Sequence, residues 1–163
     1  MTAQSAGTAR GSGAGKLVAL FIAAAWIVSL VVYSAIRPKL TMSRGLFAAA
    51  QAGNMATVET LLRKGAVVNL RDKDSHTALW LAAAGGHAEV VQELLARGSD
   101  ANARGVDGLT PLMAAAKNGD AATVRALMAH SADRAALGPN GVTALSLAQS
   151  AHHTEAAAAL QAR

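Results

Sequence analysis

A period of 33 residues constrains this chain of 163 residues more than any other feature. Three threonines, each followed two positions later by a leucine, recur at this step, and so do three glycines. These residues are Thr77, Leu79, Thr110, Leu112, Thr143 and Leu145, with Gly53, Gly86 and Gly119. Residues 77–100 and 110–133 are identical at ten of 24 aligned positions. A repeat of this length predicts a solenoid in which each unit buries its apolar face against its neighbours.

The pattern within one unit predicts a turn followed by two antiparallel helices. Thr110 supplies a hydroxyl cap, and Pro111 suits the first helical position because its missing N–H would have no partner there. Leu112 and the alanines three and four residues after it share one face of a helix. Gly119 suits the left-handed residue that ends this helix. The second helix then carries its apolar residues inward: Val124, Leu127 and Met128.

We expect the array to occupy residues 44–163. Its expected parts are an N-terminal cap (44–73), two full repeats (74–106 and 107–139) and a C-terminal cap (140–163). The first unit lacks the threonine, so Ser43 is its expected helix cap, and His152 replaces the glycine in the last unit. The dipeptides Asp107–Gly108 and Asn140–Gly141 predict tight turns ahead of the first helices.

These repeats resemble the ankyrin-repeat family, whose period is 33 residues and whose signature is T-P-L-H-x-A-A-x-x-G-H. Further matches are Gly86-His87, Val90-Val91, Leu94-Leu95, Gly98 and Asn102. The resemblance implies an all-α solenoid that binds proteins. In the family, the signature histidine links neighbouring loops by hydrogen bonds. Here Trp80, Met113 and Ser146 replace it, so we expect packing to supply some of that rigidity.

An apolar run over residues 17–36 precedes the array and contains no charged side chain. As a helix its 20 residues would extend about 30 Å, the thickness of the hydrocarbon core of a bilayer. Pro38 is expected to end this helix. The sequence therefore predicts a flexible tail (1–16), one transmembrane helix (17–36) and a linker (37–43) ahead of the array.

A secretion signal cleaved near Ser34 is the alternative interpretation of the run, although the run is longer than the usual signal core. Cleavage would release a secreted or periplasmic protein that supports or protects a partner enzyme. For an uncleaved span, the positive-inside rule leaves both orientations open. Three cationic groups lie on each side: Arg10, Lys16 and the α-amine against Arg37, Lys39 and Arg44.

The composition and motifs give no sign of catalysis. The chain has no cysteine, which excludes disulfides and thiolate zinc sites. It contains neither G-x-S-x-G nor H-E-x-x-H, and its five histidines lack a spacing that would converge on a metal ion. These are His76, His87, His130, His152 and His153. We expect no enzyme activity, cofactor, metal site or small-molecule substrate, and the interspersed charges indicate no nucleic-acid partner.

The resemblance implies that the turn tips and the exposed face of the first helices bind another protein. Carried over to matching positions, the contact residues would be Lys73, Asp74, His76, Val106, Asp107, Leu109, Lys117, Asn118, Asn140 and Val142. Trp80 lies one turn inside its helix and is expected in the core.

Overall fold

The computed structural model describes residues 13–162, without the side chains of residues 13–23, Ile36 and Lys39. The chain divides into two units, Met1–Pro38 and Lys39–Arg163. Helix α1 (Gly13–Gln51) extends across this boundary. Residues 1–12 of the expected tail (1–16) lie outside the described residues, while residues 13–16 belong to α1 and do not form a flexible tail.

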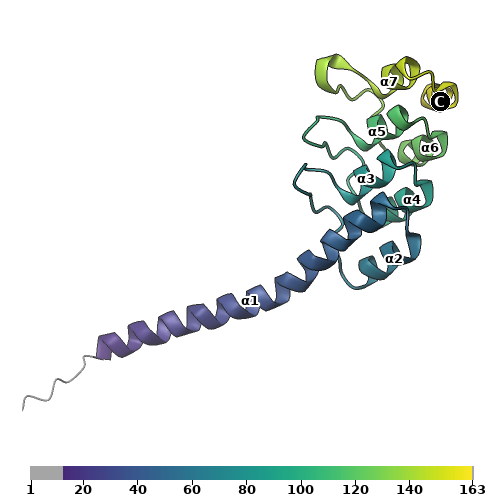
Figure 1. Cartoon of the computed structure of the whole chain (residues 1–163). Helices are drawn as coiled ribbons and strands as arrows, with labels where there is room; N and C mark the ends of the chain where they lie inside the picture. The colour runs from purple at the N-terminus through teal and green to yellow at the C-terminus, as the bar shows by residue number, and fades with distance from the viewer. Residues whose placement is uncertain (1–12, 163) are drawn as a thin grey trace, which may run out of the picture. The chain divides into compact units, whose positions relative to one another are not determined.

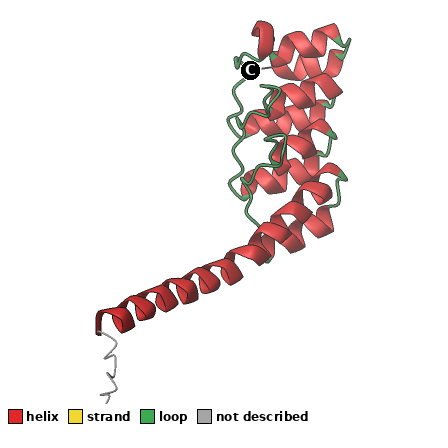
Figure 2. Cartoon of the chain, turned by 60° about the vertical axis from the view of Figure 1, so that its left-hand side comes forward, coloured by secondary structure: helices red, strands yellow, loops and turns green. Residues whose placement is uncertain are grey.

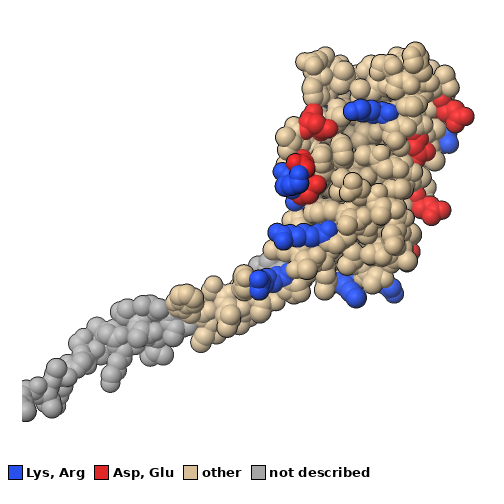
Figure 3. Space-filling model, in the orientation of Figure 1, with Lys and Arg blue, Asp and Glu red and all other residues tan. Residues whose placement is uncertain are grey.

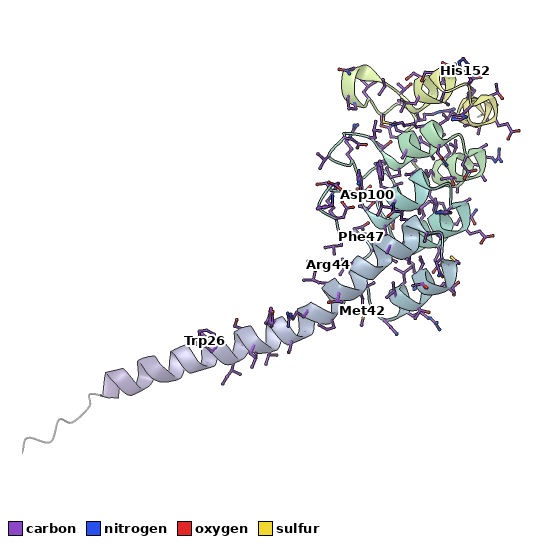
Figure 4. All side chains as sticks on the ribbon, in the orientation of Figure 1. Trp26, Met42, Arg44, Phe47, Asp100 and His152 are labelled. Carbon is purple, nitrogen blue, oxygen red and sulfur yellow. The ribbon has the colours of Figure 1, made fainter. Side chains whose placement is uncertain are left out.

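The first unit exposes a series of large apolar side chains on α1, from Trp26, which is 73% exposed, to Tyr33 (Figure 4). The guanidinium of Arg37 lies over the ring of Tyr33, 4.8 Å from its centroid. Among the helices of the described residues, none is both long and apolar enough to span a membrane. Part of the expected transmembrane helix, residues 17–23 and Ile36, lies outside the described side chains, and the span stays a prediction.

Two expectations about the end of the apolar run differ from the structure. Helix α1 continues through Pro38 instead of ending there, so residues 37–43 are helical and do not form an irregular linker. A proline removes one helical hydrogen bond and crowds the preceding turn, at about 3 kcal/mol, and the leucine, methionine and alanine residues that follow favour helix. Ser43 lies inside α1 and caps no helix. Its buried hydroxyl accepts the N–H of Val67 at 2.7 Å.

The second unit stacks pairs of antiparallel helices. After the end of α1 come α2 (Met55–Arg63), α3 (Ala78–Ala84), α4 (Ala88–Ala96), α5 (Pro111–Asn118), α6 (Ala121–Ala129), the short 3-10 helix η1 (Pro139–Gly141), α7 (Ala144–Ser150) and α8 (Thr154–Gln161). Helices α3, α5 and α7 form one row, and α2, α4, α6 and α8 form a second row beside it (Figure 1). The loops that precede α3, α5 and α7 project from the same side of the stack (Figure 2).

Threonine hydroxyls begin the first helix of each of the last three helix pairs. Thr77, Thr110 and Thr143 accept the N–H of the residue three positions later, at 3.2, 3.3 and 3.1 Å. Pro111 occupies the first turn of α5, and Gly119 ends that helix with φ +83°. Because each cap recurs at the same step, the period of the sequence becomes a period of helix starts.

The core repeats with the same step. In the first row, Leu46, Leu79 and Leu112 are at most 1% exposed and occupy equivalent positions in successive units. In the second row, Val58, Val91 and Val124 are completely buried. The small side chains of Ala82, Ala115 and Ala148, also completely buried, let neighbouring helices approach closely.

Polar side chains also join neighbouring units. Asn69 donates to the carbonyl of Gly98 and accepts the N–H of Asp100, and Asn102, one period later, does the same with Ser131 and Asp133. Arg71 donates to the carbonyls of Ser75 and Arg104, and Arg104 donates to those of Gly108 and Leu137. Packing was expected to supply some of the rigidity that the signature histidine gives, and these side chains add hydrogen bonds between units to it.

Two histidines make a further set of these links. The Nε2 atoms of His87 and His153 donate to the carbonyls of Gln51 and Lys117, at 2.9 and 3.2 Å, in each case across to the preceding unit. Both rings lie against glycine. A Cβ built on Gly53 or on Gly119 would lie 2.5 Å from the Nδ1 atom of His87 or His153. Glycine at these positions therefore serves the close approach of a ring as well as a left-handed backbone.

Candidate functional site

A hollow of about 290 Å³ opens between α3, α5 and the loop that precedes α5. We call it the α3–α5 hollow and define it by its lining residues, Trp80, Ala84, Asp107, Leu109, Ala114, Lys117 and Asn118. Four predicted contact residues, Asp107, Leu109, Lys117 and Asn118, are among them. The loop and the end of α5 thus bring an apolar wall, one cation and one anion to the same depression.

Trp80 lines this hollow and is half-buried. Its indole Nε1 donates to the carbonyl of Leu109 in the next loop, at 3.2 Å. Its ring stacks on His76, with centroids 3.8 Å apart and planes inclined by 19°. The placement of Trp80 in the core was wrong: it reaches a neighbouring loop and leaves one side accessible. Trp80 stands where the signature has a histidine, to which the resemblance assigns hydrogen bonds between loops. This position could have indicated that Trp80 links two loops.

The loop of residues 72–76 positions His76 beneath this tryptophan. The Oδ1 atom of Asp72 accepts the N–H groups of Asp74 and His76, at 2.9 and 2.8 Å, which folds the loop on itself. A Cβ on Gly105 would lie 2.5 Å from the ring of His76. His76 is therefore held between Gly105 and Trp80, and it supports the wall of the hollow more than it offers a free surface.

Lys73 and Asp74 form an exposed ion pair at the tip of the same loop, with Nζ and Oδ2 2.8 Å apart. Their hydrogen bond, together with the opposite charge, raises the pKa of Lys73, and the same hydrogen bond lowers the pKa of Asp74. Both groups are charged at neutral pH. Exposed pairs of this kind contribute little to stability, so both charges remain available to a partner.

The ligand atoms of Asp72, Asp74 and His76 lie within 4.8 Å of one another, a grouping that the spacing of the histidines did not suggest. The loop itself uses these groups. Asp72 accepts backbone N–H groups, Asp74 pairs with Lys73, and Nδ1 of His76 lies 3.8 Å from Oδ2 of Asp72. The arrangement is accounted for by the fold of the loop.

The remaining predicted contact residues lie on loop tips outside the hollow. Val106 is 72% exposed, and its N–H donates to the carbonyl of Asp74 at 3.0 Å, which joins the first two loops. Asn140 is exposed and Val142 is half-buried, and both lie in the loop that precedes α7. The structure thus joins the loops before α3 and α5 in one surface and adds the third loop as its edge.

Charges of both signs lie on the face of the array shown in Figure 3, where Lys and Arg side chains are interspersed with Asp and Glu. No single-sign stripe of the kind that follows a phosphate backbone is seen on this face. Trp80, Ala84 and Ala114 line the hollow but are not among the ten contact residues predicted from the sequence, whereas the polar residues around them are.

The stack of capped helix pairs, with loops projecting from one side, defines a helical repeat protein whose exposed loops and first helices form its characteristic surface. Comparison with models of protein families identifies the family of this repeat protein. The model described as ankyrin repeats (3 copies) matches residues 20–105, 46–133 and 85–162. The chain belongs to the ankyrin-repeat family, and the expected all-α repeat fold is confirmed. A search of curated proteins found no match. Ankyrin repeats are typically non-enzymatic and indicate a protein–protein interaction module.

Proposed function

We propose that this chain is a membrane-tethered module that binds a partner protein through the α3–α5 hollow and the loop tips beside it. The observation that carries the proposal is the composition of the hollow. Trp80 and Leu109 supply an apolar wall, and Lys117 and Asp107 supply one charge of each sign. Interface energy concentrates in partly exposed aromatic anchors that fill or line pockets and are surrounded by polar groups.

The hollow suits a protein side chain better than a metabolite. It is at the lower limit of volumes that enclose a small ligand, and it opens onto two loop tips that extend the contact area. Val106 projects from one tip, and the Lys73–Asp74 pair lies on the other. A partner that places one apolar side chain against Trp80 would meet charged groups on either side, which favours a defined orientation.

The membrane tether is the second part of the proposal and is supported by the sequence of residues 17–36. Apolar side chains are exposed along the described part of this helix, and Arg37 over Tyr33 resembles the pairs that suit a headgroup region. A tether would raise the local concentration of a modest binder near membrane partners. The alternative, release by signal cleavage near Ser34, would give a secreted or periplasmic protein that supports a partner enzyme.

Added negative charge in the hollow and on the loop tip beside it should abolish partner capture. We expect the double substitution Lys117→Glu and Val106→Asp to remove the crosslinked adducts that the tagged full-length chain forms in cells. Both side chains are exposed, so the melting temperature should change little.

A matched control changes the net charge equally on the second row of helices. Arg125→Glu with Ala129→Asp alters two exposed residues of α6 and should leave the adducts in place. If the variant with Lys117→Glu and Val106→Asp captures the same partners as the wild type, or if both variants lose them equally, the hollow is not the binding site.

Membrane fractionation of the full-length chain with a C-terminal tag tests the tether. We expect the tag to sediment with membranes and to remain there after a high-salt wash. Protease added to the outer face of intact cells then reports the side on which the array lies, since only an exposed array is digested. A shortened, freely soluble product would contradict the tether and support release by cleavage.

A further inference from the structure

Two Asn-Gly pairs occur in the array, and the structure holds them differently. Asn118–Gly119 ends α5, and Asn140–Gly141 forms part of η1, while both asparagine side chains are exposed. Glycine after asparagine leaves its backbone nitrogen uncrowded, so that nitrogen can reach the asparagine Cγ when the backbone is free to adjust. Local structure therefore decides in which pair the glycine nitrogen can attack the asparagine Cγ and displace ammonia.

The first pair is restrained by the helix and by the neighbouring unit. The N–H of Gly119 donates to the carbonyls of Ala115 and Ala116, at 2.9 and 3.3 Å. The amide of Asn118 lies directly against the turn at Gly86, where an added Cβ would be 2.8 Å from its Nδ2 atom. For Cγ to meet the Gly119 nitrogen, the end of α5 would have to unwind and the amide would have to leave this turn.

The second pair lies in the short 3-10 turn η1, ahead of α7. Asn140 has the left-handed values φ 55° and ψ 23°, an uncommon conformation for a residue with a side chain. The N–H of Gly141 donates to the carbonyl of Gly138 at 3.2 Å. No heavy atom lies within 4 Å of the position that a Gly141 Cβ would take. The space around Gly141 is therefore open, and its nitrogen can approach Cγ of Asn140 without meeting a neighbouring unit.

We infer that Asn140 is a site of spontaneous self-modification and that Asn118 is protected from the same reaction. The backbone nitrogen of Gly141 loses its proton to solvent and attacks Cγ of Asn140. The new N–Cγ bond replaces the Cγ–Nδ2 bond, and ammonia leaves from the succinimide ring. Water then opens the ring. Cleavage of the new bond gives aspartate, and cleavage of the original peptide bond gives isoaspartate, in which the main chain passes through the side-chain carbonyl.

Either product adds one negative charge to the loop before α7. Isoaspartate also lengthens the backbone within a turn that the N–H of Gly138 closes by donating to the carbonyl of Val142 at 2.8 Å. The modification would therefore alter the charge and the shape of this loop tip with time. The chemistry itself does not depend on the proposed binding function.

Ageing of the purified full-length chain at mildly alkaline pH tests the inference by peptide mass mapping. Trypsin separates the two pairs, because residues 118–125 and 135–163 each lie between cleavage sites and each contains one asparagine. We expect the mass increase that accompanies replacement of NH2 by OH in residues 135–163. It should appear about tenfold faster than in residues 118–125, because reaction at Asn118 requires the end of α5 to open.

The same incubation in concentrated urea separates the effect of structure from that of sequence. The two rates should converge when the chain is unfolded, since both pairs are then unrestrained. Asn140→Gln should abolish the change in residues 135–163, because a glutamine would have to form a larger ring. Equal rates in the folded chain, faster reaction at Asn118, or an equally large preference in urea would each overturn the inference.

Discussion

Leu112→Asp is expected to unfold the array. Leu112 is 1% exposed and lies in the row of leucines that joins successive units. Loss of a buried leucine costs about 2–5 kcal/mol, and burial of a carboxylate without a partner adds several kcal/mol. The sum approaches the whole stability of a typical domain, about 5–15 kcal/mol. Thermal melting of the full-length chain, followed by far-UV circular dichroism, should show loss of the cooperative transition.

Leu137→Asp provides the matched control for this experiment. Leu137 is 60% exposed in a loop. The same chemical change there should therefore alter the free energy of unfolding by no more than about 0.5 kcal/mol, as at other surface positions. An unchanged transition in Leu112→Asp would mean that Leu112 does not face the core, and the register of the repeats would be wrong.

Gly119→Ala is expected to cause the second-largest loss of stability. Gly119 has φ +83°, where a residue with a Cβ is disfavoured by about 1–2 kcal/mol. Its new Cβ would also lie 2.5 Å from the Nδ1 atom of His153. The ring would have to move and break the hydrogen bond from its Nε2 to the carbonyl of Lys117, which adds about 1 kcal/mol. Chemical denaturation should therefore show a loss of about 2–3 kcal/mol.

Gly65→Ala isolates the backbone part of this loss. Gly65 has φ +87° with nothing within 4 Å of a Cβ, so its substitution should cost only the conformational penalty of about 1–2 kcal/mol. Adding His153→Ala to Gly119→Ala should recover part of the difference, measured as a coupling energy in a double-mutant cycle. Equal losses at the two glycines, with no coupling to His153, would show that the contact does not constrain Gly119.

The side chains that link the units recur at the period of the sequence, but only the structure shows that they form hydrogen bonds between units. Asn69 and Asn102 lie one period apart, as do Arg71 and Arg104, and His87 and His153 lie two periods apart. A period in polar residues can reflect solvation, caps or links between units. The sequence does not say which of these applies, because the partner carbonyls are backbone groups common to all residues.

His152 illustrates a local feature that the sequence only partly predicts. It occupies the position held by Gly53, Gly86 and Gly119 in earlier units, and it adopts φ +61° at the turn between α7 and α8 (Figure 4). The period predicts a left-handed residue here, whereas the histidine argues against one. The helix pair on either side determines the outcome, since the chain must reverse at this point to place α8 beside α6.

The sequence by itself determined the repeat, its step, the threonine caps and the leucine and valine rows, because these depend on spacing along the chain and on the burial of apolar side chains. Only the tertiary structure decided that Trp80 faces a hollow, that α1 continues through Pro38, and that two Asn-Gly pairs differ in restraint. The first and the third depend on which groups from distant segments meet, whereas the continuation of α1 depends on the helix propensity of the residues around Pro38. Such contacts balance a local conformational cost against packing, and the spacing of residues does not report that balance.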